Sequence, residues 1–204
     1  PATPSQGFPL LPSPSKPLRG RASAEAEVHA WLEEGSQWLT IVGAGGMGKT
    51  HLARAVCAGR GALWCDLRSA QTEAQVMVLV GQALGLQLNS DLAKESTRIT
   101  QCIEARAPEV IVLDNLEQAS EAALKQMHDW LDGLPEARII ATSRAPIRLP
   151  RETILRLGSL PEEAAVALFT ERAAAVLGQA HSWNPEVLLD LVNQLDDAIP
   201  GGGI

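Results

Sequence analysis

Residues 43–50 read GAGGMGKT, and they directly follow the apolar run Trp38–Val42. Four glycines in eight positions are unfavourable within a strand or a helix. They are favourable where a strand ends in a loop whose backbone N–H groups turn inward around phosphate. The pattern G-x-x-x-x-G-K-[ST], with a strand before it and a helix after it, predicts a phosphate-binding loop.

The residues of this loop have distinct expected roles. Backbone amides would surround the phosphates, Lys49 would reach the β- and γ-phosphates, and the Thr50 hydroxyl would ligate Mg²⁺. The alternative is a glycine-rich turn with no ligand, and the complete pattern favours binding. The candidate nucleotide-binding residues are Gly43, Ala44, Gly45, Gly46, Met47, Gly48, Lys49, Thr50 and His51.

Within residues 109–114 (EVIVLD), the run 110–113 is apolar and rich in β-branched residues, and it ends at an acid, which is typical of a central parallel strand. Asp114 would then lie at the edge where open α/β sheets bind ligands. Its expected task is to hold a Mg²⁺-bound water. Asp114 is therefore a candidate for catalysis together with Lys49, and for metal binding together with Thr50. The alternative is an acid that caps the following loop.

The residue after Asp114 bears on hydrolysis. Many P-loop ATPases of this strand arrangement place a glutamate there as the base for the attacking water, but this chain has Asn115, whose amide cannot take the proton. Glu117 could act from a shifted position, or it could begin the next helix. We therefore expect slow hydrolysis, with both interpretations of Glu117 open.

Arg144 follows the expected strand 138–142 (RIIAT) and is a candidate contact for a γ-phosphate through charge-assisted hydrogen bonds. The alternative is a solvated arginine after a strand. A basic stretch also allows a nucleic-acid interface, but the net charge of −7 and the lack of interleaved aromatics argue against one. The arginines of this stretch are Arg138, Arg144, Arg148, Arg151 and Arg156.

Strands alternate with helices as far as residue 157, which predicts a parallel sheet covered on both faces. The fold class is therefore α/β, a three-layer P-loop NTPase sandwich with a mostly parallel five-stranded sheet. We expect helices over 23–34, 49–58, 71–85, 91–106 and 118–132, and strands over 38–42, 61–67, 109–114, 138–142 and 153–157.

The chain divides into three parts. Residues 1–18 hold six of the thirteen prolines and read as a linker. Residues 19–158 form the predicted nucleotide-binding domain. Residues 159–204 read as the truncated start of a helical lid subdomain, with helices over 161–177 and 185–195 and with closing glycines that suggest a truncation point or cloning residues.

Composition limits the remaining possibilities. With 204 residues, 46% of them hydrophobic, the chain suits a globular domain of a cytoplasmic protein without a membrane span or signal peptide. Cys57, Cys65 and Cys102 lack disulfide or zinc spacing and predict reduced, buried thiols. The histidines have no partner at metal spacing. Trp31, Trp130 and Trp183 predict core or interface anchors, and the first residue, Pro1, suggests a piece of a longer chain.

Taken together, GAGGMGKT, VIVLDNLEQ, IIATSR and LGSLPEEAAVALF resemble the signal-transduction ATPases with numerous domains (STAND), which are related to the NB-ARC ATPases of apoptosis and plant immunity. The resemblance covers roughly residues 18–200. It implies ATP or ADP with Mg²⁺ as ligands, and it alone favours adenine over guanine. It assigns Arg144 to reading the phosphates, Arg21 to a segment that packs near adenine, and Pro200 to a contact with adenine.

For this chain, the resemblance implies a switch. ADP would hold a closed state, and exchange for ATP would open it and permit homo-oligomerisation. The expected partners are a C-terminal winged-helix part, sensor domains and an effector domain outside this chain. Two alternatives remain: an AAA+-like ATPase with active turnover on nucleic acid or protein, and a degenerate scaffold without nucleotide, which intact Lys49, Thr50 and Asp114 disfavour.

Overall fold

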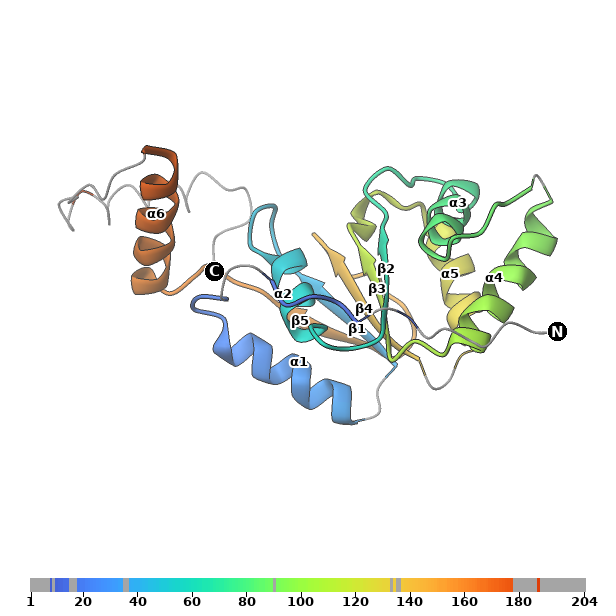
Figure 1. Cartoon of the computed structure of the whole chain (residues 1–204), viewed down its shortest axis with the longest axis horizontal. Coiled ribbons are helices and arrows are strands. Elements are labelled where there is room, and N and C mark those ends of the chain that lie inside the picture. Colours follow the sequence, from blue (N-terminus) through green and yellow to red (C-terminus); the bar gives the residue numbers. More distant parts are fainter. Residues whose placement is uncertain are drawn as a thin grey trace.

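The computed structural model describes residues 8, 10–14, 18–34, 37–89, 91–132, 134, 137–177 and 187. Five strands form one sheet in the order β2-β3-β4-β1-β5, and all four pairings between them are parallel (Figure 1). The predicted α/β fold with a five-stranded sheet is confirmed. The strands are β1 (Trp38–Val42), β2 (Ala62–Asp66), β3 (Val110–Asp114), β4 (Arg138–Ser143) and β5 (Glu152–Arg156). The helices are α1 (Ala22–Glu34), α2 (Lys49–Val56), α3 (Glu73–Ala83), α4 (Leu92–Arg106), α5 (Glu121–Asp132) and α6 (Glu162–Leu177), with a 3₁₀ turn η1 (Leu116–Gln118).

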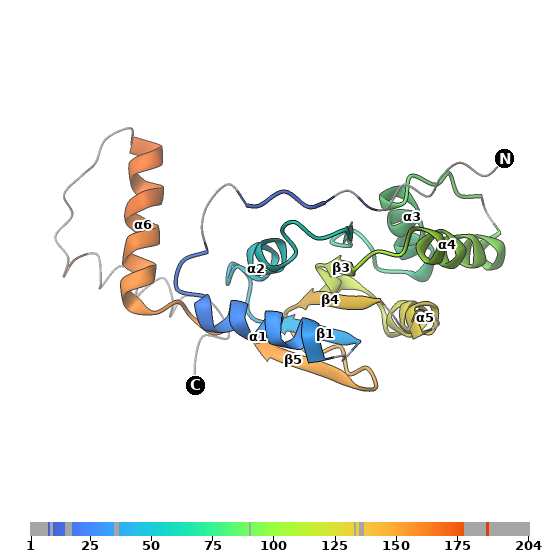
Figure 2. The same cartoon turned by 60° about the horizontal axis from the view of Figure 1, so that its bottom comes forward.

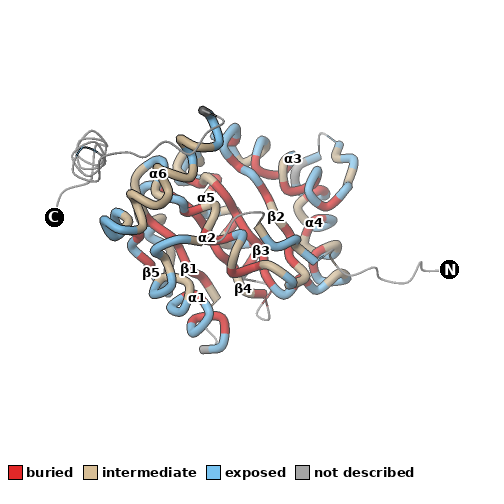
Figure 3. Tube along the Cα trace, turned by 60° about the vertical axis from the view of Figure 1, so that its left-hand side comes forward, coloured by how far each residue is buried: buried red, intermediate tan, exposed pale blue. Residues whose placement is uncertain are grey.

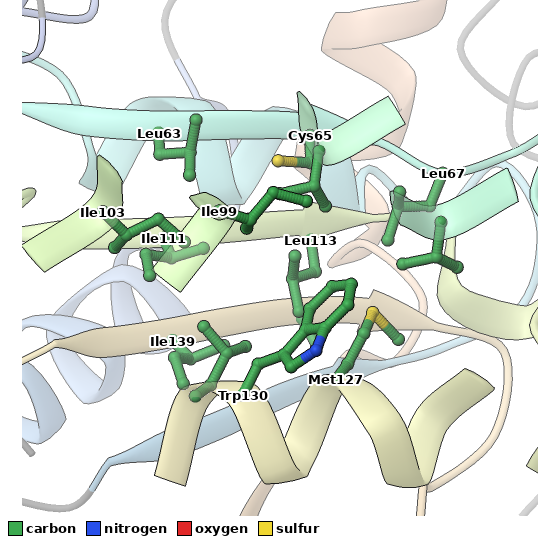
Figure 4. Close-up of a cluster of buried hydrophobic side chains, with 14 of the residues drawn as sticks. Leu63, Cys65, Leu67, Ile99, Ile103, Ile111, Leu113, Met127, Trp130 and Ile139 are labelled. Atoms are coloured by element: carbon green, nitrogen blue, oxygen red, sulfur yellow. The ribbon is translucent and has the colours of Figure 1, made fainter. Parts of the chain in front are cut away.

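A hydrophobic cluster lies on each face of the sheet, because successive side chains of a strand point to opposite faces. On one face, α1 and α2 bury Trp31 and Leu52. On the other, α3, α4 and α5 cover the sheet, and Figure 4 shows Met127 and Trp130 of α5 pointing toward Leu113 of β3. The central strands β1 and β3 are consequently buried at every position, as Figure 3 shows.

Side-chain caps explain where two of the helices begin. The Thr72 hydroxyl accepts a hydrogen bond from Gln75 N, and the Gln75 side chain bonds back to the Thr72 backbone, which forms a capping box at the start of α3. An Asp91 carboxylate oxygen likewise accepts from Lys94 N at the start of α4. Both helices therefore start slightly later than the expected ranges 71–85 and 91–106.

The helix expected over 118–132 is wrong at its start. A 3₁₀ turn occupies Leu116–Gln118, Ala119 is extended, and α5 begins only at Glu121. The physical reason is a third capping residue, because the Ser120 hydroxyl accepts a hydrogen bond from Ala123 N at 3.3 Å. The short turn places Glu117 outside α5, so of the two open interpretations the start of the next helix does not apply.

The helix expected over 161–177 is present as α6, and it stands apart from the sheet (Figures 1 and 2). Pro161 precedes it, and its carbonyl accepts a hydrogen bond from Ala165 N. An ion pair between Arg19 and Glu171, with Nε and Oε2 3.2 Å apart, connects α6 to the segment before α1. The helix expected over 185–195 lies outside the described residues except at one position, and the domain boundaries at 18 and 158 stay predictions.

The described residues of the proline-rich start lie against the domain. Leu10 forms a bridge with Gly61, and Leu11 forms one with Ala58. Leu11 N donates to Arg60 O at 3.1 Å, and its carbonyl accepts from Gly59 N at 2.9 Å. These bonds hold the segment beside α2 and the start of β2, as the views in Figures 1 and 2 agree.

The predictions drawn from composition concern thiols, metals and membranes. Cys57 and Cys65 are free and buried, and burial raises the pKa of both thiols to about 12, whereas Cys102 is only partly buried. Within the described residues, no three His, Cys, Asp or Glu side chains gather as metal ligands. None of the helices found there is both long and apolar enough to cross a bilayer.

Gly43 connects β1 to the glycine loop at a point of close backbone approach. A Cβ at Gly43 would lie 2.7 Å from the carbonyl oxygen of Leu157, and Leu157 cannot retreat easily because its N–H donates to Val42 O at 2.7 Å. We expect Gly43→Ala to lower the free energy of unfolding by about 1–3 kcal/mol. The matched change Gly158→Ala meets no atom within 4 Å and should be neutral or stabilising by about 0.4–1 kcal/mol. Chemical denaturation measures both, and equal effects would contradict the steric explanation.

Candidate functional site

The glycine loop lies between the end of β1 and the start of α2, as the sequence predicted. Gly46 and Gly48 have φ values of 82° and 86°, in the left-handed region that side chains disfavour. Gly48 immediately precedes Lys49, the first residue of α2, so the loop leads into a helix N-terminus. That terminus carries free N–H groups and a partial positive charge, which together suit an anion.

Lys49 folds back onto the loop that contains it. Its Nζ donates hydrogen bonds to the carbonyl oxygens of Gly43 at 2.7 Å and Ala44 at 2.9 Å. The side chain is buried, and this desolvation lowers its pKa, while the negative charges of Glu117 and Asp114 act in the opposite direction. Lys49 is thus a buried ammonium held by two neutral acceptors, which a phosphate could replace with a charged one.

Asp114 is 1% exposed and accepts two hydroxyl hydrogen bonds at the tip of β3. Its Oδ1 accepts from Thr50 Oγ1 at 2.8 Å and from Thr142 Oγ1 at 2.5 Å. The two hydroxyls come from α2 and β4, so one carboxylate oxygen joins three elements. The structure thus brings together Thr50 and Asp114, the two residues expected at the metal.

The oxygens of Thr50 and Asp114 fit a magnesium ion. Mg²⁺ prefers hard oxygen ligands, and it is usually held by one or two protein groups together with phosphate and water oxygens. The Thr50 hydroxyl and the Asp114 carboxylate lie side by side at the entrance to α2. A cation there would also neutralise a carboxylate that is buried without an ion pair among the described residues.

Asn115 turns the chain sharply at the end of β3, with φ 66° in the left-handed region. Its N–H donates to Thr142 Oγ1 at 2.9 Å, and its side-chain amide donates to Asp66 Oδ1 at 3.0 Å. The Asp66 carboxylate thus orients the side chain that replaces the expected glutamate. Asn115 is committed to hydrogen bonds on either side and has no basic group to offer.

Glu117 and Arg144 meet across the next part of the site. Arg144 Nε lies 3.3 Å from Glu117 Oε1, and the arginine side chain is 64% exposed while that of the glutamate is 16% exposed. The Arg144 guanidinium also reaches the loop, because a Cβ added to Gly45 would lie 3.7 Å from its Nη2. The ion pair therefore spans the space between the glycine loop and η1.

A cavity of about 450 Å³ opens above these groups. It brings together most of the residues predicted for the site, and it adds Asn115 and Arg54, which the predicted set lacked. Its lining residues are Gly45, Gly46, Gly48, Lys49, Thr50, His51, Arg54, Asn115, Glu117 and Arg144. Gly43, Ala44 and Met47 complete the loop outside this lining, Asp114 lies beneath Thr50, and Pro200 lies outside the described residues.

Arg54 could have been found from its spacing, because it follows His51 by three residues on one helix. Its guanidinium stacks over the ring of Trp64, 4.9 Å from the centroid. A second cavity of about 380 Å³ begins at His51 and Arg54 and is bounded by Trp64 and by residues 11–14 of the N-terminal segment. Two cavities therefore share one face of α2.

Arg21 approaches the loop from the side of α1. Its Nη2 donates to the Met47 carbonyl at 3.1 Å, and its Nη1 donates to the Ser159 carbonyl at 3.4 Å. Burial of the guanidinium lowers the pKa of Arg21. The segment that was expected to pack near adenine is thus joined both to the loop and to the connection before α6.

Comparison with known proteins agrees with this architecture. Residues 32–149, more than half of the chain, match the AAA domain family. This chain belongs to the AAA domain family. The domain is 32% identical over 145 residues to proteins named as proposed HTH-type transcriptional regulators in Mycobacterium tuberculosis (strain H37Rv) and Mycobacterium bovis. That match covers 68% of this chain but 16% of each regulator, so the chain spans less than a fifth of the length of these curated relatives.

Solved structures show the same fold at low sequence identity. Cdc6p from Pyrobaculum aerophilum has a TM-score of 0.64 at 14% identity, over 89% of this chain and 57% of that one. A Walker-type ATPase of Pyrococcus abyssi has a TM-score of 0.58 at 18% identity, over 95% of this chain and 68% of that one. The Orc1 protein of Aeropyrum pernix, solved in complex with DNA, has a TM-score of 0.55 at 12% identity, over 78% of this chain and 50% of that one. A P-loop ATPase fold of this kind implies a nucleotide and typically Mg²⁺.

Proposed function

We propose that this AAA domain is the ATP- and ADP-binding module of a STAND-type signalling ATPase, which acts as a nucleotide-dependent switch with slow hydrolysis. The observation that carries the proposal is the contact of Arg144 with Glu117 beside the glycine loop. An arginine that already has a carboxylate partner must exchange it to bind a γ-phosphate. Its position therefore depends on which nucleotide is bound.

In the proposed complex, loop amides and Lys49 hold the phosphates, while Thr50 and Asp114 hold Mg²⁺. Magnesium would neutralise negative charge on the β- and γ-phosphates. Lys49 would leave the two loop carbonyls that it now contacts, and Arg21 would steady the loop from the side of the base. Pro200, as a contact for adenine, stays a prediction from the resemblance.

The switch requires that ATP and ADP differ in their contacts, because a ligand shifts an equilibrium only by its differential affinity for the two states. Arg144 is the candidate for that difference, since it lies at the mouth of the cavity and is more than half exposed. An exchange of one ion pair for another is worth about 1–3 kcal/mol of coupling, which changes a population ratio about 5- to 150-fold.

The partners of the switch lie beyond this chain. We propose a winged-helix part, sensor domains and an effector domain within a longer cytoplasmic protein, with homo-oligomerisation in the ATP state. The similarity to proposed HTH-type regulators of much greater length supports a role in signalling.

A second candidate function is an ATPase with active turnover on nucleic acid or protein. Glu117 favours it, because a carboxylate reaches the cavity despite Asn115. Turnover in the steady state that DNA, RNA or a substrate protein stimulates would support this candidate over the switch. The net charge of −7 disfavours direct contact with nucleic acid by this domain.

The decisive experiment is to purify the chain without added nucleotide, denature it, and identify what it releases by chromatography. We expect ADP in an amount close to one per chain, because the proposed closed state holds ADP until it is exchanged for ATP. If the protein is empty and calorimetry detects no affinity for either ATP or ADP, the proposal fails.

A further inference from the structure

We propose that Glu117 is the base that takes the proton of the attacking water, and that Arg144 holds Glu117 inactive until a γ-phosphate draws the arginine away. This inference rests on the proposed function, since it requires that ATP binds in the cavity. It goes further by naming the group that performs hydrolysis and the group that delays it.

The backbone after β3 explains why the third residue beyond Asp114 reaches the cavity. Asn115 adopts the left-handed conformation and directs its amide to Asp66 on the neighbouring strand. Leu116 is 2% exposed and points into the core. The 3₁₀ turn then brings Glu117 back toward the glycine loop, where it lines the cavity.

The carboxylate of Glu117 is not satisfied by its present contacts. Its Oε1 faces Arg144 at 3.3 Å, while its Oε2 is buried and has no hydrogen-bond partner among the described residues. A buried acceptor without a partner costs about 1–3 kcal/mol, more when it is charged. A purely structural glutamate would be expected to use both oxygens. Since Oε2 is buried, the oxygen that Glu117 could offer to a water is Oε1, which becomes free when Arg144 moves away.

The charge of Glu117 already acts on the phosphate site. Among the groups that raise the pKa of Lys49, Glu117 has the largest influence, ahead of Asp114. Glu117 also lines the same cavity as Lys49, which is expected to contact the β- and γ-phosphates. The negative charge of Glu117 would repel the phosphates of ATP unless Arg144 neutralises either the glutamate or the γ-phosphate. Arg144 is therefore coupled electrostatically to both of these groups.

The other proton acceptors of the site are less suited to this role. Asp114 Oδ1 accepts two hydroxyls, and the residue is expected at the metal. His51 lies on the face of α2 where the second cavity adjoins the first. Among the described acceptors that line the cavity, Glu117 is the carboxylate in direct contact with Arg144.

The proposed step balances without a further reagent. The water oxygen forms a bond to the γ-phosphorus, and the bond between that phosphorus and the oxygen bridging to the β-phosphate breaks. Its electron pair leaves with ADP. The water proton passes to the Glu117 carboxylate and from there to solvent, so that ATP and water give ADP and phosphate. Arg144, once on the γ-phosphate, stabilises the charge that moves across it.

The test compares Glu117→Gln with Glu121→Gln, the same change on the exposed first turn of α5. For Glu117→Gln we expect hydrolysis in a single turnover to fall about 100- to 10,000-fold, with ATP binding retained. Glu121→Gln should match the unchanged protein. If ATP binds but Glu117→Gln hydrolyses at the unchanged rate, or if the unchanged protein does not hydrolyse ATP at all, this inference is wrong. If the unchanged protein binds neither ATP nor ADP, the proposed function itself is wrong.

Two further measurements separate a base from a structural residue. Formate supplied to Glu117→Ala should restore part of the hydrolysis, because a small carboxylate can occupy the vacated space. Glu117→Gln should raise the affinity for ATP relative to ADP several-fold by releasing Arg144, and Arg144→Gln in the same chain should abolish that gain. A gain that persists without Arg144 would contradict the proposed restraint, and an absence of formate rescue would argue against the proposed base.

Discussion

We expect the replacement of Lys49 with alanine to lower the affinity for ATP about 10- to 100-fold. Hydrogen bonds to charged groups contribute about 1.5–3 kcal/mol, and each 1.4 kcal/mol corresponds to a factor of ten in the dissociation constant. Lys49 is buried at the first turn of α2, and its Nζ lies between the carbonyls of Gly43 and Ala44. Among the described residues, Arg54 and Arg144 are the arginines that line the same cavity.

Isothermal titration calorimetry with ATP and Mg²⁺ measures this loss directly. Lys94→Ala is the matched control, because Lys94 is 82% exposed and its ion-pair partner among the described residues is Asp91 at the start of α4. Lys49→Ala also leaves two loop carbonyls without their donor, so thermal unfolding without nucleotide must show that the variant is folded. If Lys49→Ala and Lys94→Ala bind ATP equally, the loop does not bind phosphate as we infer.

The parts of the site that the sequence predicted best depend on local geometry. GAGGMGKT prescribes a strand, a turn and a helix start within eight residues, so Lys49 and Thr50 could be placed without knowledge of the sheet. Asp114 could be placed because a buried run that ends in an acid indicates the carboxyl end of a strand. Thr50 follows β1 and Asp114 ends β3. Because these strands are parallel, their carboxyl ends lie at the same edge of the sheet, where Thr50 contacts Asp114.

The contacts that were not predicted depend on strand order and on single backbone angles. The bond from Thr142 to Asp114 requires β4 to lie between β1 and β3, and no pattern within either segment determines that order. The position of Glu117 requires a left-handed Asn115 and a cap at Ser120, which the helical periodicity of 118–132 concealed. Arg144 could be named as a candidate, but its partner could not.

Arg54 shows a different limit. Its side chain is charged and exposed on a helix, and such residues are usually solvated. Only the folded chain shows that Trp64 of the edge strand β2 and the segment 11–14 meet that helix face. The proline content of residues 1–18 predicted a linker. The described residues Leu10 and Leu11 of this segment form bridges with the turn after α2, which no pattern in the segment indicates.

Replacing Asp114 with asparagine should abolish the contribution of Mg²⁺ to ATP affinity while leaving the fold intact. Asparagine keeps the shape and one oxygen, so the Thr50 and Thr142 hydroxyls retain an acceptor, but the charge that attracts the cation is lost. A buried carboxylate without a cation is unfavourable, and we therefore expect the variant without nucleotide to be at least as stable as the unchanged protein.

Titration of ATP in the presence of Mg²⁺ and again in the presence of EDTA separates the contribution of Mg²⁺ to ATP affinity from a role of Asp114 in positioning the loop. We expect the unchanged protein to bind ATP at least about tenfold more tightly with Mg²⁺, which corresponds to 1.4 kcal/mol, and Asp114→Asn to bind equally under both conditions. Asp129→Asn, on the exposed side of α5, should behave as the unchanged protein. A full magnesium effect in Asp114→Asn would place the cation elsewhere, whereas weaker binding under both conditions would mean that Asp114 positions the loop through Thr50 instead of holding the metal.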